Sequence, residues 1–209
     1  MKASRCGRSA GALAALLAIV CALASNANAQ SLVDAPVSVC GFLGVARGAN
    51  EVPASKQRWD IAGGISALVQ ESRSRLLAGE MNFWYAQTSA AEPFRYATGA
   101  IVVDVRGRLA VNVPLEVPAV VFLSGGVGAL FPLNQRVLAQ PPSPDFEPNT
   151  PALALPLAAG VRVSLDDQYG VELRATYVLT TTDNLNAPHD GQNDGVFALT
   201  LGVVVRVGY

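Results

Sequence analysis

The stretch FALTLGVVVRVGY, residues 197–209, decides the fold of this chain. Starting at Phe197, every second residue is large and apolar, and the series ends on the aromatic Tyr209. The residues between them are small or polar, with Val204 as the one exception. A repeat of two sustained over this length predicts a β-strand with one apolar face.

The same alternation recurs along most of the chain in almost the same phase, and helical spacing is scarce. Odd-numbered positions carry mainly large apolar residues, whereas even-numbered positions carry mainly Gly, Ala, Ser and Thr with an occasional charge. Together with the closing segment, this pattern predicts eight strands. Their expected ranges are about 36–46, 58–70, 76–86, 95–113, 119–131, 153–165, 171–180 and 196–209.

The lengths of the connections also alternate, which is independent evidence. Short turns at one end and long loops at the other are typical of a transmembrane up-and-down barrel, whose turns are periplasmic and whose loops face outward. We therefore predict an all-β fold, an eight-stranded antiparallel up-and-down transmembrane β-barrel. The short connections are 71–75, 114–118 and 166–170, and the long ones, rich in Pro, Asn, Asp and Gly, are 47–57, 87–94, 132–151 and 181–195.

The beginning of the sequence has the pattern of a secretory signal peptide. Lys2, Arg5 and Arg8 form a positive segment, residues 10–24 are small or apolar throughout, and residues 27–29 supply the small residues of a cleavage site. The apolar run is too short for a membrane-spanning helix. We expect residues 1–29 to be removed and residues 30–209 to form one outer-membrane barrel domain.

The expected mature chain is mildly acidic. Cleavage removes three of the fifteen basic residues and none of the sixteen acidic ones, which leaves 12 − 16 = −4. This balance argues against a nucleic-acid partner. Cys40 would be the only cysteine left, so an intramolecular disulfide is excluded.

Alternation by itself does not say whether the apolar face points into a core or out to lipid. A secreted lipocalin-like carrier also has eight strands, with its apolar face inside around a ligand. A water-facing exterior is normally rich in lysine, yet the expected mature chain has a single lysine, Lys56, in a loop. The small residues of the other face suit the narrow interior of an eight-stranded barrel. The composition therefore favours apolar side chains turned to lipid.

With this orientation, the charged residues of the strands face the lumen. Both signs occur on neighbouring strands, so we expect a paired network. Mutual neutralisation in a filled lumen is the simpler interpretation, and a gate whose pairs open a very narrow pore is the alternative. The predicted lumen residues are Glu80, Asp104, Arg106, Arg162, Glu172, Arg174 and Arg206, with Asp60 on the same face.

Three stretches carry a resemblance to a known family: FLSGGVGALF, LPLAAGVRVSLDDQYGVELRATYVLTTTDNL and the closing FALTLGVVVRVGY. They resemble the small bacterial outer-membrane β-barrel proteins, the class of the OmpA transmembrane domain. The resemblance implies contact with outer-membrane lipid and insertion by the barrel assembly machinery. That machinery would read the terminal strand through Val205, Val207 and Tyr209, with Tyr209 in place of the commoner Phe.

Catalytic and metal-binding patterns are weak. A lipid A deacylase needs a serine beside a histidine, and the one histidine, His189, lies in a loop without serine. The Asp- and Asn-rich loop 181–195 offers oxygen ligands, but its spacing matches no EF-hand and calcium there stays an open question. We expect no cofactor and no enzymatic activity.

The sequence thus predicts an integral outer-membrane protein with a structural or surface-interaction role and a largely filled lumen. The alternatives are a lipid A-modifying enzyme and a soluble carrier. The long loops would determine any partner, whose identity the sequence does not reveal.

Overall fold

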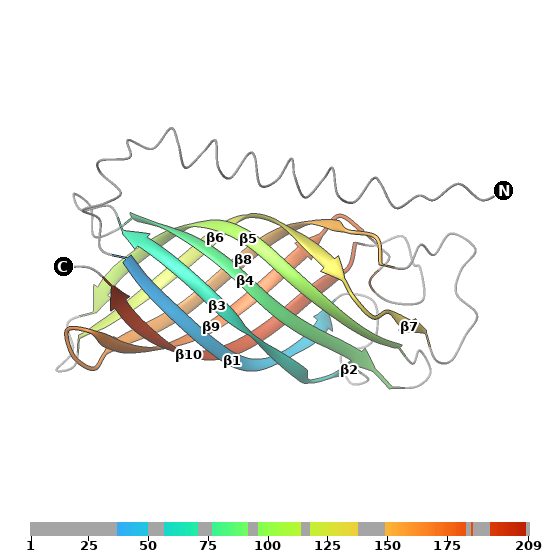
Figure 1. The fold of residues 1–209 in the computed structure, drawn as a ribbon, viewed down its shortest axis with the longest axis horizontal. Helices are drawn as coiled ribbons and strands as arrows, with labels where there is room; N and C mark the ends of the chain where they lie inside the picture. Colours follow the sequence, from blue (N-terminus) through green and yellow to red (C-terminus); the bar gives the residue numbers. More distant parts are fainter. Residues whose placement is uncertain are drawn as a thin grey trace.

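The computed structural model describes residues 37–49, 57–70, 77–91, 96–113, 118–137, 149–182, 185 and 193–207. All regular secondary structure within these residues is β-strand (Figure 1). No helix in the described part is long and apolar enough to cross a membrane. The expected signal peptide, residues 1–29, lies outside the described residues, as do His189 and Tyr209.

Eight long strands form the wall, and two pairs of residues extend it. The number of strands agrees with the prediction from alternation. β2 (Gln57–Arg58) and β7 (Arg136–Val137) are the two short extensions. The long strands are β1 (Val37–Ala49), β3 (Asp60–Gln70), β4 (Leu77–Ala90), β5 (Tyr96–Val113), β6 (Ala119–Pro132), β8 (Ala152–Ser164), β9 (Tyr169–Thr180) and β10 (Gly195–Val207).

Several expected connections are wrong in their extent: β1 continues to Ala49 within 47–57, β7 lies within 132–151, and the largest difference is at 87–94. The sequence placed a long loop at 87–94, but residues up to Ala90 pair with β5, from Gln87↔Gly99 to Ala90↔Tyr96. The strand was predicted to end before Gln87 because Gln87, Thr88 and Ser89 are all polar. Thr88 is nevertheless buried inside the barrel, so the side-chain alternation continues through the polar segment.

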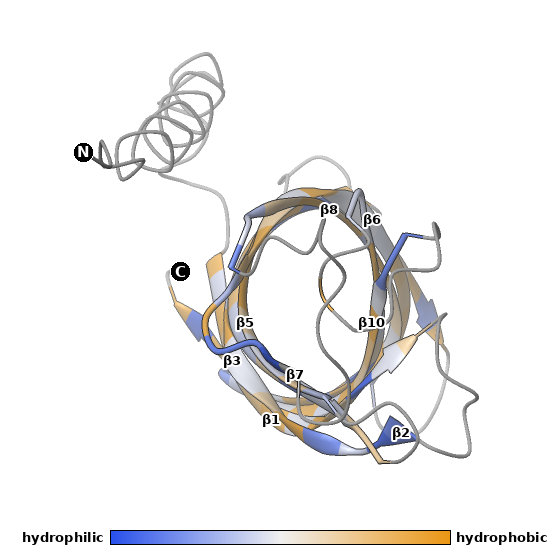
Figure 2. Ribbon diagram, turned by 90° about the vertical axis from the view of Figure 1, so that its right-hand side faces the viewer, coloured by the Kyte–Doolittle hydropathy of each residue, from blue (hydrophilic) through white to orange (hydrophobic). Residues whose placement is uncertain are grey.

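The strands form a closed antiparallel cylinder in which each long strand pairs with its neighbours in sequence. The first and last strands close it, because β1 pairs with β10 from Val37↔Val207 to Ala49↔Gly195. Figure 2 shows this closed ring along the barrel axis. Closure gives every strand of the wall two hydrogen-bonded neighbours, which is what a lipid environment requires of a sheet.

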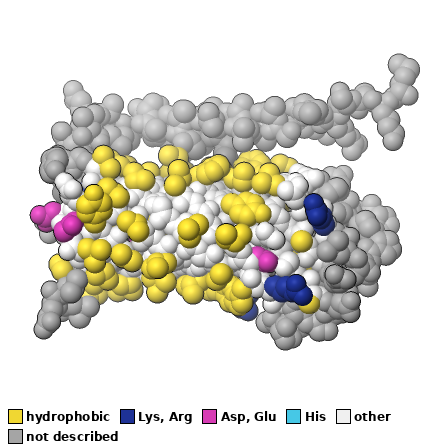
Figure 3. All heavy atoms as spheres, turned by 60° about the horizontal axis from the view of Figure 1, so that its bottom comes forward, with side chains coloured by type: hydrophobic (Ala, Val, Ile, Leu, Met, Phe, Trp, Pro, Cys, Tyr) yellow, Lys and Arg dark blue, Asp and Glu magenta, His cyan; other side chains and the backbone are white. Residues whose placement is uncertain are grey.

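The phase of the alternation is constant around the cylinder. Every large apolar side chain that is exposed in the described residues occupies an odd-numbered position, among them Leu43, Leu155 and Leu201. The buried charged side chains all occupy even-numbered positions, among them Glu80 and Glu172. The apolar side chains therefore cover the outer wall (Figure 3). This orientation is the opposite of a lipocalin-like carrier, whose apolar face would enclose the ligand.

The lumen has an apolar layer on the side of the long loops. Val102, Leu130 and Val178 are completely buried there and belong to one cluster with Trp84. Leu185, from the connection between β9 and β10, joins the same cluster. The backbone carbonyl of Leu185 accepts a 2.7 Å hydrogen bond from the Thr98 hydroxyl. Its amide donates to the Asp194 carboxylate at 2.6 Å, which fixes the residue at the mouth.

Several glycines allow neighbouring strands of the wall to approach closely. A Cβ at Gly126 would lie 1.9 Å from the carbonyl oxygen of Val105 on the paired strand. A Cβ at Gly44 would lie 2.0 Å from the carbonyl oxygen of Leu199. Only glycine permits these close approaches of strand to strand, which follow from the curvature of a small barrel.

A charge on the outer wall should be most destabilising at the middle of the barrel. Leu201→Arg, at the centre of β10 and 58% exposed, should lower the free energy of unfolding by about 2–4 kcal/mol in lipid vesicles. Val207→Arg, equally exposed at the end of the same strand, should cost about 0–1 kcal/mol. Urea titrations followed by tryptophan fluorescence measure both. Equal stability of Leu201→Arg and the wild type would contradict a lipid-facing wall.

Candidate functional site

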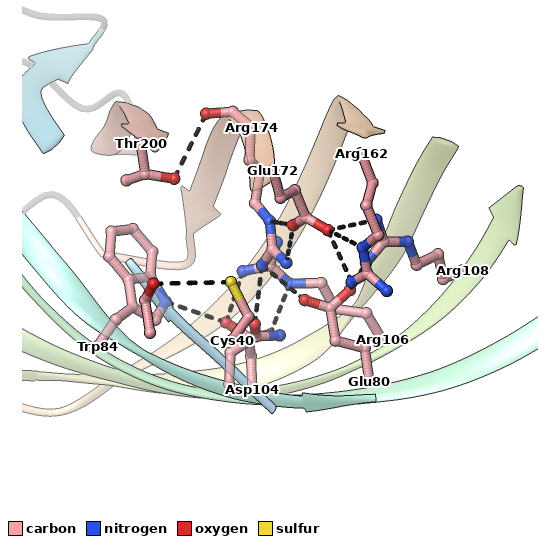
Figure 4. A network of polar contacts seen from close by, with 12 residues as sticks. Cys40, Glu80, Trp84, Asp104, Arg106, Arg108, Arg162, Glu172, Arg174 and Thr200 are labelled. Carbon is pink, nitrogen blue, oxygen red and sulfur yellow. Dashed lines mark hydrogen bonds and ion pairs between the residues drawn. The ribbon is translucent and has the colours of Figure 1, made fainter. Parts of the chain in front are cut away.

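Charged and polar side chains from four strands meet in the lumen on the side of the short turns. They all occupy inward-facing, even-numbered positions, where the apolar layer ends. β9 and β5 supply most of them, and β4 and β8 supply the remainder (Figure 4). The lumen network consists of Glu80 and Asn82 from β4, Asp104, Arg106 and Arg108 from β5, Arg162 from β8, and Glu172 and Arg174 from β9.

Glu172 is the centre of the lumen network. Its Oε2 accepts from Arg108 Nη2 at 2.7 Å and from Arg162 Nε at 2.9 Å, and Arg162 Nη2 lies 2.8 Å from the same oxygen. Its Oε1 accepts from Arg174 through both Nε, at 2.9 Å, and Nη2, at 2.5 Å. One carboxylate thus contacts three guanidinium groups from three strands. Figure 4 shows the three arginines converging on it.

Arg174 carries the network across the lumen. Its Nη1 lies 2.6 Å from Glu80 Oε1 and donates to Asn82 Oδ1 at 2.9 Å. In the circular strand order, β4 and β9 are separated by three strands on either side. They are therefore diametrically opposite, and the guanidinium of Arg174 spans the barrel between two carboxylates.

Asp104 forms a second centre that is joined to the first through Asn82. Arg106 binds it in a bidentate manner, with Nε–Oδ1 at 2.6 Å and Nη2–Oδ2 at 2.8 Å. Asn82 Nδ2 donates to Oδ1 at 2.8 Å, and the Trp84 indole donates to Oδ2 at 3.2 Å. Bidentate arginine–carboxylate pairs are among the strongest hydrogen-bonded pairs in proteins.

Burial makes the network a closed assembly. The side chains of its ion pairs are at most 4% exposed, apart from Arg162 at 15%. The Arg108 guanidinium also stacks on the ring of Phe122, 3.3 Å from the ring centroid. Four arginines face three carboxylates, so the network has a formal charge of 4 − 3 = +1.

Six of the seven predicted lumen residues belong to this network, and Arg206 does not. Arg206 is exposed at the short-turn end, where its Nη1 donates to the Asp167 carbonyl at 3.1 Å. Asp60 is also separate, since its carboxylate accepts from the Ser89 hydroxyl at 2.7 Å. The sequence interpretation left out Arg108, although it has the same inward phase as Arg106. It also missed Asn82 and Trp84, which bond Asp104 on the neighbouring strand. Of these contacts, only that of Asn82 with Arg174 crosses the lumen.

Val205 and Val207 of the predicted assembly signal lie at the end of β10. Val207 is exposed on the outer wall and Val205 is half-buried there, whereas Tyr209 is outside the described residues. The loop 181–195 that raised the question of calcium is described only in part. Among the described residues, no group of three His, Cys, Asp or Glu side chains is arranged to hold a metal ion.

Chemically, the lumen network offers charge pairing, with each carboxylate already engaged by arginine. Such an arrangement suits rigid closure of the lumen. It shows neither a general base free to act nor a nucleophile beside one, within the residues the structure describes.

Comparisons with known proteins agree with this architecture. No family model matches the chain, and no curated protein matches it in sequence. Among solved structures, Neisserial surface protein A aligns with a TM-score of 0.56 and 11% identity, covering 82% of this chain and 97% of that one. The outer membrane protein OprG from Pseudomonas aeruginosa aligns with a TM-score of 0.52 and 7% identity, covering 86% and 99%. The chain therefore has the fold of the small transmembrane outer-membrane barrels, as its sequence resemblance implied.

Removal of the central carboxylate should be costly. Glu172→Gln leaves the guanidinium groups of Arg108, Arg162 and Arg174 without their shared anion, which should destabilise the barrel by about 3–5 kcal/mol. Asp60→Asn, outside the lumen network, is the control and should change stability by less than about 1 kcal/mol. Urea unfolding in vesicles measures both. A Glu172→Gln variant as stable as the control would show that the network is energetically unimportant.

Proposed function

We propose that the protein is a non-enzymatic integral barrel of the outer membrane, with a closed lumen and a structural or surface-interaction role. Its long loops would contact partners outside the cell, because loops on a rigid barrel are the usual sites of recognition. The apolar outer wall and the fold shared with outer-membrane barrels support the location. An exported precursor with a cleaved signal peptide completes the proposal.

The observation that carries the closed lumen is the contact of Arg174 with Glu80, from β9 to the opposite strand β4. A solute on the barrel axis would have to displace this ion pair and the Arg174–Glu172 pair beside it. Separating buried partners leaves uncompensated charge in a medium of low dielectric, at a cost of several kcal/mol. The apolar layer with Leu185 forms a second barrier on the loop side.

A lipid A-modifying enzyme is the weaker alternative. Such an enzyme would need its nucleophile and base together at the outer wall, where acyl chains arrive. The outward-facing positions of the eight long strands hold neither histidine nor carboxylate side chains in the described residues. We therefore favour a role in which the barrel is a rigid support for its loops.

Planar-bilayer recordings test the closed lumen. The wild-type protein should show no stable conductance steps at moderate voltage, because two layers of packed side chains block the axis. Heat-modifiable migration on gels, together with recovery in the outer-membrane fraction, would establish that the inserted species is the folded barrel. Regular single-channel steps from such protein would contradict the proposal, and recovery as a soluble periplasmic protein would contradict its location.

The proposed assembly signal has its own test. Deletion of Tyr209 should lower the amount of heat-modifiable barrel in the outer membrane by about tenfold, since the terminal aromatic would be read during insertion. Tyr169→Ala is the matched control, because Tyr169 is an exposed aromatic that pairs with Val205 near the end of β10. Normal outer-membrane levels of the truncated protein would overturn the role given to the terminus.

A further inference from the structure

Three arginines lie on the outer face of the barrel at the long-loop end: Arg47 on β1, Arg58 on β2 and Arg136 on β7. We call them the arginine rim. Arg47 is the only charged residue at an odd-numbered position of the eight long strands. The other two have even numbers, so uninterrupted alternation would have directed them into the lumen.

A β-bulge turns Arg58 outward. In β3 the pairing with β4 reaches Ala62↔Ala86, whereas in β2 it continues as Arg58↔Ser89. Three residues of the first strand thus oppose two of β4, which inserts one extra residue and reverses the phase. Arg58 now pairs with Ser89, which alternates with the buried Thr88 and Ala90. Its side chain is accordingly exposed on the outside.

A second bulge does the same for Arg136. The pairing of β5 with β6 reaches Ala100↔Pro132, and that with β7 resumes as Ala97↔Arg136. Here too, three residues oppose two, and Arg136 comes to share the outer face with Ala97. Bulges often re-aim a side chain at a functional position. Two of them flank one hairpin, β4–β5, and each exposes an arginine.

The two bulges place their arginines in one row. Arg58 pairs with Ser89, Ser89 with Ala97, and Ala97 with Arg136. Three strand-to-strand steps separate the two guanidinium-bearing positions, a distance of roughly 14 Å at the usual spacing. At one end of the face drawn in Figure 3, Lys and Arg side chains follow the hydrophobic ones.

Arg47 lies beside this row in an aromatic setting. Its guanidinium is 5.0 Å from the ring centroid of Trp59 and 5.8 Å from that of Phe197. Trp59, next to Arg58 in the chain, is half-exposed and makes an edge-to-face contact with Phe197. Aromatic residues in such girdles mark the boundary between the hydrocarbon region and the headgroups. The rim is therefore at the level of lipid headgroups.

No arginine of the rim forms an ion pair with a described residue. The nearby Asp60 accepts a hydrogen bond from Ser89, and with the three arginines it gives a charge of 3 − 1 = +2 for these four described residues. Arg58 and Arg136 are exposed at headgroup level and have no carboxylate partner among the described residues, and a planar guanidinium in that setting is suited to bind phosphate.

We propose that the arginine rim binds the phosphate groups of the phosphorylated glycolipid of the outer leaflet. Arg58 and Arg136 would each contact one end of a bisphosphorylated disaccharide headgroup, and its acyl chains would lie against the apolar wall below. The inference rests on the proposed outer-membrane location, with the long loops outside. It assigns the lipid contact to the side of the barrel formed by β1, β3, β4, β5 and β6.

The test is a titration of the folded, detergent-solubilised protein with bisphosphorylated lipid A, followed by native mass spectrometry. Dephosphorylated lipid A and phosphatidylglycerol are the comparison lipids. The double variant Arg58→Gln/Arg136→Gln should bind bisphosphorylated lipid A about tenfold more weakly or worse, since each rim charge contributes to anionic-lipid binding. Arg206→Gln, which removes an exposed arginine at the opposite end, is the matched control and should bind like the wild type.

Wild-type binding should require the phosphates and weaken with added salt. Equal binding by the double variant, or equal binding of the dephosphorylated lipid, would overturn the proposal. Phosphatidylglycerol binding as tightly as lipid A would overturn the assignment to the glycolipid. If heat-modifiable migration shows that the double variant does not fold, the variant Arg58→Lys/Arg136→Lys replaces it. This variant keeps the charge and should retain binding within a few-fold. A barrel recovered in the outer membrane that fails this titration refutes the rim alone, whereas absence from the outer membrane refutes the proposed function.

Discussion

The pairing of β1 with β10 is the constraint on which the rest of the structure depends. It runs over the full length of both strands, from Val37↔Val207 to Ala49↔Gly195. In lipid, an unpaired strand edge would leave a row of backbone groups without hydrogen bonds, each at a cost of several kcal/mol. Because the sheet closes, the side chains of each strand have only two directions available, and the period of two divides them between lipid and lumen. The outer wall can then be almost uniformly apolar, as the exposed odd-numbered residues show.

That division concentrates the charges of the strands in a narrow space, where they must neutralise one another. The packing around Arg108 shows how the small residues serve this end. A Cβ at Gly160 would lie 2.4 Å from Cζ of Phe122, so the glycine makes room for the ring. The ring in turn supports the Arg108 guanidinium at 3.3 Å, and Arg108 reaches Glu172 at 2.7 Å. The small residues on the inner face are thus the space in which the aromatic and charged side chains of other strands pack.

Much of this could be predicted from sequence because alternation is a local signal. The number of strands follows from counting the alternating segments, and the shared face of Glu80 and Arg174 follows from their even numbers. The orientation of the wall needed composition as well, above all the single lysine of the expected mature chain. The contact between Glu80 and Arg174 follows from neither alternation nor composition, since it depends on β4 and β9 being diametrically opposite in the closed ring. The position of Arg206 was misjudged because the parity of a residue number indicates a face of the sheet and not a position along the barrel axis. Arg58 and Arg136 fail the alternation altogether, because a single extra residue in each bulge reverses the phase without any sequence pattern that marks it.

The same contacts that stabilise the lumen network also oppose its opening. Arg174 is bound by Glu172, Glu80 and Asn82, so any movement that clears the axis breaks several short contacts at once. Glu80 would then keep only Arg108, whose Nη1 is 3.7 Å away. A gate needs two arrangements of similar free energy, and a displaced Arg174 would find no second carboxylate in the network that is not already paired with arginine. The lumen network therefore favours permanent closure over switching.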